Sequence, residues 1–267
     1  MLLSSVIIVL REVLEAALLF SILIALAKHS AISNRWMLWS LALGLVGAVI
    51  YGMNLSNISE WFDGVGQEVA NAFIQLFIYA VLVIYMGVQV YFKDQAMTSK
   101  YWFLVLMIVI TSLAMTREGA EILLYFFSAT HRENHYVSVL IGMIIGASIG
   151  VSVGFLFYYL LVSLRSLWAL RIGLALLILV SAGMVSQASL LLIQADWLPA
   201  QMPLWDTSTF LSEKTAMGQL MYALIGYEAT PTAIQASLYL FGLLFPVGII
   251  ALVNSKNIAY NKVAETK

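Results

Sequence analysis

The sequence has no cysteine and very little charge, and both absences narrow what the chain can be. Among its 267 residues only 10% are charged and four are proline. The lack of cysteine excludes disulfides, thiolate metal sites and cysteine nucleophiles. Soluble domains carry about 25% charged residues, whereas 62% of this chain is hydrophobic. The composition therefore predicts a membrane protein.

Seven apolar segments are long enough to cross about 30 Å of hydrocarbon as α-helices. We place them at residues 2–27, 37–56, 72–92, 101–127, 137–163, 170–194 and 232–253. The remainder leaves no room for a soluble domain, so residues 1–267 are expected to form one transmembrane domain. The predicted fold class is an all-α integral membrane protein with seven transmembrane helices.

The positive charges between these segments concentrate on one side of the predicted membrane. Nine of them share that side: Lys28, Arg35, Lys93, Lys100, Arg165, Arg171, Lys256, Lys262 and Lys267. Only Arg132 and Lys214 lie on the other side. Because lysine and arginine near helix ends mark the cytoplasmic side, we expect the N-terminus outside and the C-terminus inside. Most acidic residues of the loops lie outside, as an ordinary solvated rim or as a surface that concentrates cations.

Three charges interrupt the first apolar segment, and the same pattern returns in the fourth. The two motifs are Arg11-Glu12-x-x-Glu15 and Arg117-Glu118-x-x-Glu121. Each such charge costs about 2.5–3.5 kcal/mol at the centre of a spanning helix, so six of them are expected to serve a purpose.

The two motif helices are predicted to run in opposite directions. We therefore interpret residues 1–95 and 100–196 as inverted repeats of three helices, followed by an external loop at 197–230 and a last helix at 232–253.

The residue types in the motifs favour a cation site. Within each motif the two glutamates share one helical face, and the arginine can pair with the second glutamate. Four carboxylates against two guanidiniums leave an excess of two negative charges, and their hard oxygen atoms suit a hard cation. From the residues alone two other interpretations stay open: salt bridges that only fix helix packing, and a proton relay.

These motifs resemble those of the oxidase-dependent iron permease family of fungi and bacteria. "PLWDTS" (203–208) and "GQLMYALIGYEATPT" (218–232) are similar to the family's last external loop and the start of its seventh helix. The resemblance implies that four glutamates bind iron during its passage, beside the motif arginines Arg11 and Arg117: Glu12, Glu15, Glu118 and Glu121. Members often show a Glu-Gly pair near the start of the third helix. Here the nearest match is Glu68-Val69, which departs from that pattern and makes Glu68 a further candidate by position only.

The resemblance implies a permease that imports iron, in the ferric form because hard anionic oxygens and the family's coupling to oxidation both favour it. Iron is then the transported substrate, with no permanently bound cofactor. Some bacterial members carry a large N-terminal external domain that this sequence lacks, so we expect a separate external oxidase or iron-capture protein. The short loops favour a bacterial inner membrane. The other expected partners are iron ions and membrane lipid. No nucleic-acid partner is expected.

Other functions remain to be weighed. No nucleophile–base arrangement and no cofactor-binding loop is visible in the sequence, so no enzymatic activity is expected. The alternatives are a transporter of another hard divalent cation such as Mn(II), a proton-coupled carrier, and a non-transporting membrane subunit.

Three further features carry expectations. His131, Glu133 and His135 follow the fourth segment on the outside, where they either catch a metal ion or form a hydrophilic turn. Glycines at 142, 146, 150 and 154 form a smooth ridge for close helix packing, within the chain or between chains. In the external loop, residues 217–225 show the pattern of a helix with one apolar face that ends at Gly226, and Pro231 suits the first turn of the last helix.

Overall fold

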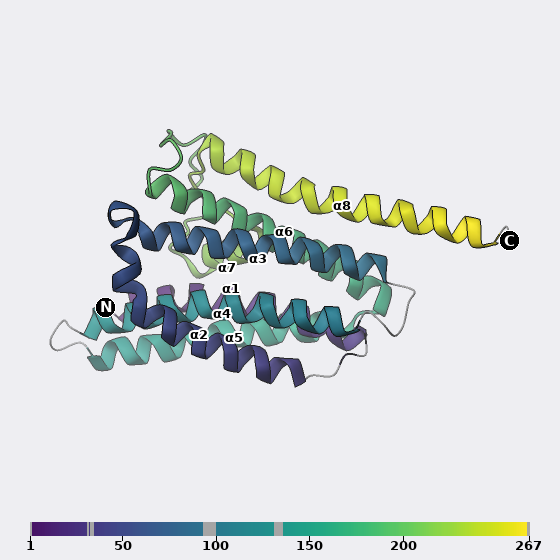
Figure 1. The fold of residues 1–267 in the computed structure, drawn as a ribbon. Helices are drawn as coiled ribbons and strands as arrows, with labels where there is room; N and C mark the ends of the chain where they lie inside the picture. The colour runs from purple at the N-terminus through teal and green to yellow at the C-terminus, as the bar shows by residue number, and fades with distance from the viewer. Residues whose placement is uncertain (1, 31, 33–34, 93–99, 131–135, 266–267) are drawn as a thin grey trace.

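A computed structural model of the chain describes residues 2–30, 32, 35–92, 100–130 and 136–265, which form a bundle of long α-helices (Figure 1). In the described part of the chain the helices are α1 (Leu2–His29), α2 (Arg35–Ser59), α3 (Gly66–Tyr91), α4 (Lys100–Thr130), α5 (Tyr136–Ser163), α6 (Ser166–Gln194), α7 (Ala216–Ile225) and α8 (Ala233–Glu265). A short 3₁₀ helix, η1 (Trp61–Gly64), joins α2 to α3. Each of the seven apolar segments expected from the sequence is a helix.

Most helices extend a few residues beyond the predicted segments, and α8 continues to Glu265 where the prediction ended at residue 253. The starts of α3 and α8 have a local cause. Helix α3 begins at Gly66 and not at residue 72, because η1 turns the chain with positive φ at Phe62, Asp63 and Gly64 and leads directly into the helix. Helix α8 begins after Thr232, so Pro231 lies before its first turn. The Thr232 hydroxyl accepts the Gln235 amide at 3.3 Å and the Gln235 side chain accepts the Thr232 amide at 2.8 Å, which is a capping box.

Six helices of the described chain are long and apolar enough to cross a membrane: α2, α3, α4, α5, α6 and α8. Helix α1 is long enough as well, but Arg11, Glu12 and Glu15 interrupt its apolar sequence near the middle. The chain is therefore a multi-pass integral membrane protein. The external helix predicted at 217–225 is α7, which ends at Gly226 with φ 64°.

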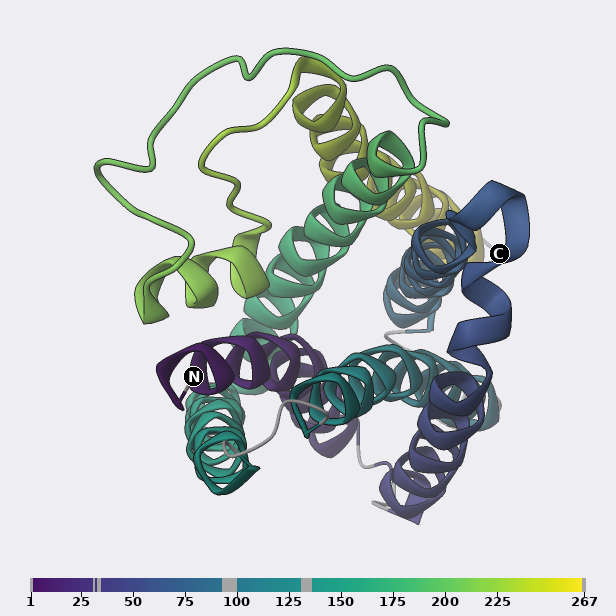
Figure 2. The same ribbon diagram turned by 90° about the vertical axis from the view of Figure 1, so that its left-hand side faces the viewer.

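Helices α1 and α4 lie side by side at the centre of the bundle (Figure 2). Along its length α1 packs on α5, and α4 packs on α2, so α2 and α5 flank the central pair on one side. Helices α3 and α6 pack on each other on the opposite side, with α8 against both. The central helices therefore have neighbours on both sides, which places their polar residues in the interior.

The glycine ridge of α5 packs within the chain, against α1. A Cβ atom at Gly146 would lie 2.5 Å from the Val6 carbonyl oxygen, and one at Gly150 would lie 2.8 Å from the Val13 side chain. Glycine also lets α2 approach α4, since a Cβ at Gly44 would lie 2.6 Å from the Met115 Cβ. Close packing within the chain is therefore the use of this ridge that the structure supports.

Candidate metal centre

The two motifs meet inside the bundle because α1 and α4 are neighbours. Arg117 of the second motif lies 3.5 Å from a carboxylate oxygen of Glu15 in the first motif, and 2.6 Å from one of Glu118. Both glutamates and Arg117 are buried. The charged residues of the two helices therefore form one continuous cluster.

Glu15 is the carboxylate that pairs with both arginines. Its Oε1 lies 3.4 Å from the Arg11 Nε, and its Oε2 lies 3.5 Å from the Arg117 Nη1. Glu121 is engaged on one oxygen, which lies 3.5 Å from the Arg117 Nε and accepts a hydrogen bond of 3.0 Å from the Asn71 amide. The arginines thus neutralise part of the cluster, mainly at Glu15.

Three other carboxylates converge on one point. Glu12, Glu118 and Glu121 each offer an oxygen, and these oxygens lie within 4.8 Å of one another. Glu12 and Glu118 are only 6% and 3% exposed, and the Oε2 atom of each is buried with no hydrogen-bond donor. Two oxygens on opposite sides of a metal ion are about 4.2 Å apart when each bond is about 2.1 Å. Only one pair of the three can be opposite, and adjacent oxygens would lie about 3.0 Å apart, so binding of one ion by all three requires the cluster to contract.

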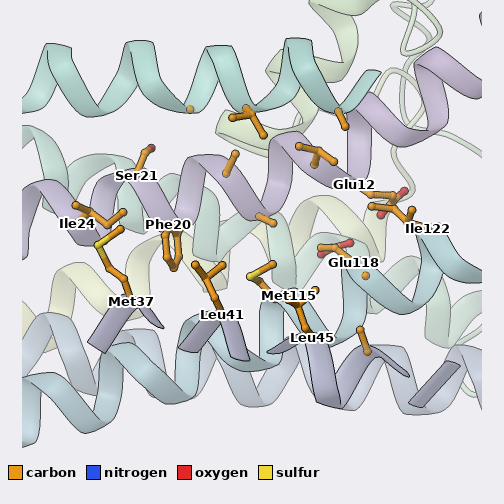
Figure 3. A pocket seen from close by; sticks show the side chains of 18 of the residues that line it. Glu12, Phe20, Ser21, Ile24, Met37, Leu41, Leu45, Met115, Glu118 and Ile122 are labelled. Atoms are coloured by element: carbon orange, nitrogen blue, oxygen red, sulfur yellow. The ribbon is translucent and has the colours of Figure 1, made fainter. Parts of the chain in front are cut away.

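The electrostatics of the cluster favour a cation. With all groups ionised, the four motif carboxylates exceed the two arginines by two negative charges, and buried carboxylates without donors are costly to leave unpaired. Glu12 is the least neutralised, since its closest positive atom is the Arg11 Nε at 4.0 Å. Figure 3 shows Glu12 and Glu118 at one end of a large apolar pocket between the helices.

The remaining candidates from the sequence do not join this carboxylate group. Glu68 is half-buried in the first turn of α3 and is not a member of it. Glu15 is paired with the arginines and is also not a member. His131, Glu133 and His135 lie outside the described residues.

The structure adds polar residues around the cluster that sequence analysis did not single out. Asn71 of α3 donates to Glu121 and accepts a hydrogen bond of 2.8 Å from the Tyr51 hydroxyl of α2. Gln75, one turn further along α3, donates to Gln187 of α6 at 2.5 Å, and both are buried. The spacing of Asn71 and Gln75 within an apolar segment was a signal for a polar helix face.

A second unpredicted neighbour comes from the long segment between α6 and α8. Tyr222 of α7 accepts a hydrogen bond from Arg11, whose guanidinium lies 4.2 Å from the centre of its ring. Beyond α7, burial and the nearby Glu213 carboxylate raise the pKa of Glu228 to about 7, with Arg11 acting in the opposite direction. The loop therefore supplies an aromatic residue and a weakly acidic carboxyl on the side of Arg11.

Comparison with known proteins identifies the family of the chain. The sequence model of the iron permease FTR1 family matches residues 2–260, which is nearly the whole chain. No curated protein and no solved structure matched the chain. Members of the matched family are permeases and not enzymes. The extent of the match shows that this chain belongs to the iron permease FTR1 family.

Proposed function

We propose that this chain imports iron through the cluster of its two Arg-Glu-x-x-Glu motifs, with Glu12, Glu118 and Glu121 as the ligands. The observation that carries the proposal is the convergence of these carboxylates within 4.8 Å, with buried oxygens of Glu12 and Glu118 that lack a donor. Glu15 holds both arginines in place and so limits the charge of the empty cluster.

We propose Fe(III) as the transported species. The donors are all carboxylate oxygens, which are hard ligands and favour a hard, highly charged ion. A cluster with an excess of two negative charges also gains more from a trivalent ion than from a divalent one. Another hard cation such as Mn(II) remains the competing substrate to be tested.

The proposed topology has seven spans, α1 to α6 and α8, with the N-terminus outside. Helix α1 is included because the motif charges that interrupt its apolar sequence lie inside the bundle. Positive charges at the inner ends of the described helices support the orientation, as for Lys28 of α1 and Arg35 of α2. The absence of cysteine allows single cysteines, introduced one at a time, to test each loop with a membrane-impermeant thiol reagent.

We propose that α1–α3 and α4–α6 are inverted repeats. In this repeat α1 corresponds to α4, α2 to α5 and α3 to α6. The packing supports it, because the contact of α1 with α5 then corresponds to the contact of α4 with α2. The equivalent helices α1 and α4 also touch each other, as do α3 and α6. A glycine allows close packing at both of these contacts. A Cβ at Gly44 of α2 would lie 3.3 Å from the Ser112 carbonyl oxygen of α4, and one at Gly146 of α5 would lie close to the Val6 carbonyl oxygen of α1. Inward release would follow rocking of one repeat against the other.

The proposed setting is a bacterial inner membrane, with a separate external oxidase or iron-capture protein. In this scheme the outer acidic residues gather cations, and the motif glutamates then replace water around the ion. The oxidation step is assigned to the partner in this scheme.

The test is uptake of radioactive iron into proteoliposomes that contain the purified chain. We expect Glu12→Gln and Glu118→Gln each to abolish uptake, because each removes a negative ligand without changing side-chain size. Ser163→Ala is the control, since Ser163 is exposed at the end of α5 and lies outside the cluster. Mn(II) and Zn(II) are added as competitors.

Uptake that survives both substitutions in folded protein would show that the motifs only fix helix packing. Uptake of Mn(II) without uptake of iron would mean that the substrate is Mn(II) and not iron, while the proposed ligand site would stand. A wild-type chain that moves no ion would favour a non-transporting membrane subunit.

A further inference from the structure

An apolar groove runs between the helices from the carboxylate cluster towards one end of the bundle. Its floor is formed by α1 and α4 and its walls by α2 and α5, and its volume is about 780 Å³ (Figure 3). Glu12 and Glu118 lie towards one end, and Ile24 and Met37 mark the other end, while Tyr158 also lines the groove. The groove is thus a feature separate from the carboxylate cluster that it reaches.

The length of the groove corresponds to one leaflet of a bilayer. From Glu12 to Ile24 along α1 it extends over about 18 Å at 1.5 Å per residue, compared with about 15 Å for half of the hydrocarbon core. The end of the groove away from the carboxylate cluster lies near the end of α1 at His29 and the start of α2 at Arg35. It therefore reaches from the middle of the bundle to the level of the helix ends.

The groove opens sideways, to the face of the bundle that lies in the membrane. Helices α2 and α5 do not pack on each other in the described part of the chain. Two of the wall residues, Leu45 and Phe155, are 58% and 59% exposed. A bilayer component can therefore enter between α2 and α5.

The lining of the groove suits a hydrocarbon chain. A single hydrocarbon chain is slender enough, and the floor is made of small side chains, with Ala16, Ala17 and Gly119 along it. An apolar lining also binds hydrocarbon and not a hydrated ion.

The end of the groove away from the carboxylate cluster carries the charge that a phospholipid head group requires. The Lys28 ammonium lies 3.5 Å from the Tyr158 hydroxyl and 5.7 Å from the centre of its ring. Arg35 is exposed at the first residue of α2, two residues before Met37 of the groove. Two cations at the mouth of an apolar channel are complementary to a phosphate with an attached acyl chain.

We propose that this groove binds one acyl chain of an anionic phospholipid, with its phosphate at Lys28 and Arg35 and its methyl end beside Glu12 and Glu118. The lipid fills the lateral opening between α2 and α5. It thereby keeps water and ions from reaching the buried carboxylates through this opening. The proposal depends on the membrane location of the chain and not on iron as the substrate.

The test uses native mass spectrometry of the purified chain with added phosphatidylglycerol or phosphatidylcholine. We expect one phosphatidylglycerol to stay bound, with phosphatidylcholine bound more weakly. Val151→Trp places a large side chain in the groove and should weaken binding at least about tenfold, the effect of losing roughly two buried methylene groups. Val137→Trp is the matched control, since Val137 lies on the same helix, is exposed, and does not line the groove.

Lys28→Gln combined with Arg35→Gln tests the head group separately. This variant should lose the preference for phosphatidylglycerol and bind both lipids equally. A second measurement needs no variant: phosphatidylglycerol with a photoreactive group near the tail end should label α1 and α4 close to the motifs. Labelling confined to the outer faces of α2 and α5 would overturn the proposal.

Two other outcomes would also overturn it. The first is equal lipid retention by wild type and Val151→Trp. The second is a dimer without bound lipid that Val151→Trp separates into monomers, which would assign the groove to a second copy of the chain.

Discussion

Arg11 is held by Tyr222, which lies on α7, outside both motif helices. Its guanidinium donates to the Tyr222 hydroxyl and stacks on the ring. Arg117, at the equivalent position of the second motif, is engaged instead by Glu15, Glu118 and Glu121. The two motifs are alike in sequence, but helix α7 makes their arginines different.

Tyr222 is expected to keep Arg11 away from Glu12. In Tyr222→Phe the hydroxyl acceptor is lost, and Arg11 is free to close its 4.0 Å separation from Glu12. Because a hydrogen bond contributes about 0.5–1.5 kcal/mol, we expect the KM for iron to rise by about two- to tenfold, with a smaller change in maximal rate. Uptake kinetics in proteoliposomes measure both. Tyr136→Phe on the exposed start of α5 is the control, and a lower rate at unchanged KM would contradict the prediction.

Substitutions of Glu12 and Glu15 are expected to have different effects on transport and on stability. Glu15→Gln removes the charge that both arginines share, and we expect the free energy of unfolding to fall by about 1–3 kcal/mol. Glu12→Gln removes a buried carboxylate oxygen that has no donor, so stability should be unchanged or higher while iron uptake is lost. Thermal unfolding in detergent, measured beside uptake, distinguishes the two. Equal destabilisation by both would mean that Glu12 is also a structural ion-pair partner.

Gly146 and Gly248 provide a matched pair for the packing of α5 on α1. A Cβ at Gly146 would lie 2.5 Å from the Val6 oxygen and 3.0 Å from the Leu10 nitrogen, and backbone atoms cannot move aside cheaply. Gly146→Ala should therefore cost about 1–3 kcal/mol. At Gly248 nothing lies within 4 Å, so Gly248→Ala should be neutral or stabilise the helix by up to about 1 kcal/mol. Thermal midpoints of the two variants test this, and equal midpoints would contradict close α1–α5 packing.

Helix positions could be predicted from the sequence because each segment is strongly apolar and of spanning length. The ends were less predictable, since they depend on local bonds such as the Thr232–Gln235 capping box and on the turn before Gly66. The approach of the two motifs was expected from the hypothesis of an inverted repeat, which would place equivalent helices together.

The division of roles within the site could not be predicted in the same way. Spacing within a motif brings Arg11 near Glu15, but it does not indicate that Arg117 reaches Glu15 across two helices at 3.5 Å. Tyr222 and Asn71 are single residues on other elements, and helical periodicity gives no information about contacts between elements. These contacts are set by tertiary packing.

Glu228 should make the stability of the external loop depend on pH. Its pKa is raised from 4.5 to about 7, so the folded chain binds a proton there more tightly than the unfolded chain does. Stability from this group is therefore complete below about pH 4.5 and is lost as the pH rises through about 7. Because the carboxyl is partly exposed, we expect the loss to be on the order of 1 kcal/mol.

Glu228→Gln should remove this dependence. Compared with wild type, its thermal midpoint should be similar at pH 5 and higher at pH 8, while the exposed Glu60→Gln should follow wild type at both values. The opposite result, a variant that is less stable than wild type at both pH 5 and pH 8, would mean that the positive charge of Arg11 outweighs burial and Glu213 at this carboxyl. The loop would then stabilise the ionised form beside the first motif, and the pH dependence of the chain would have to come from other groups.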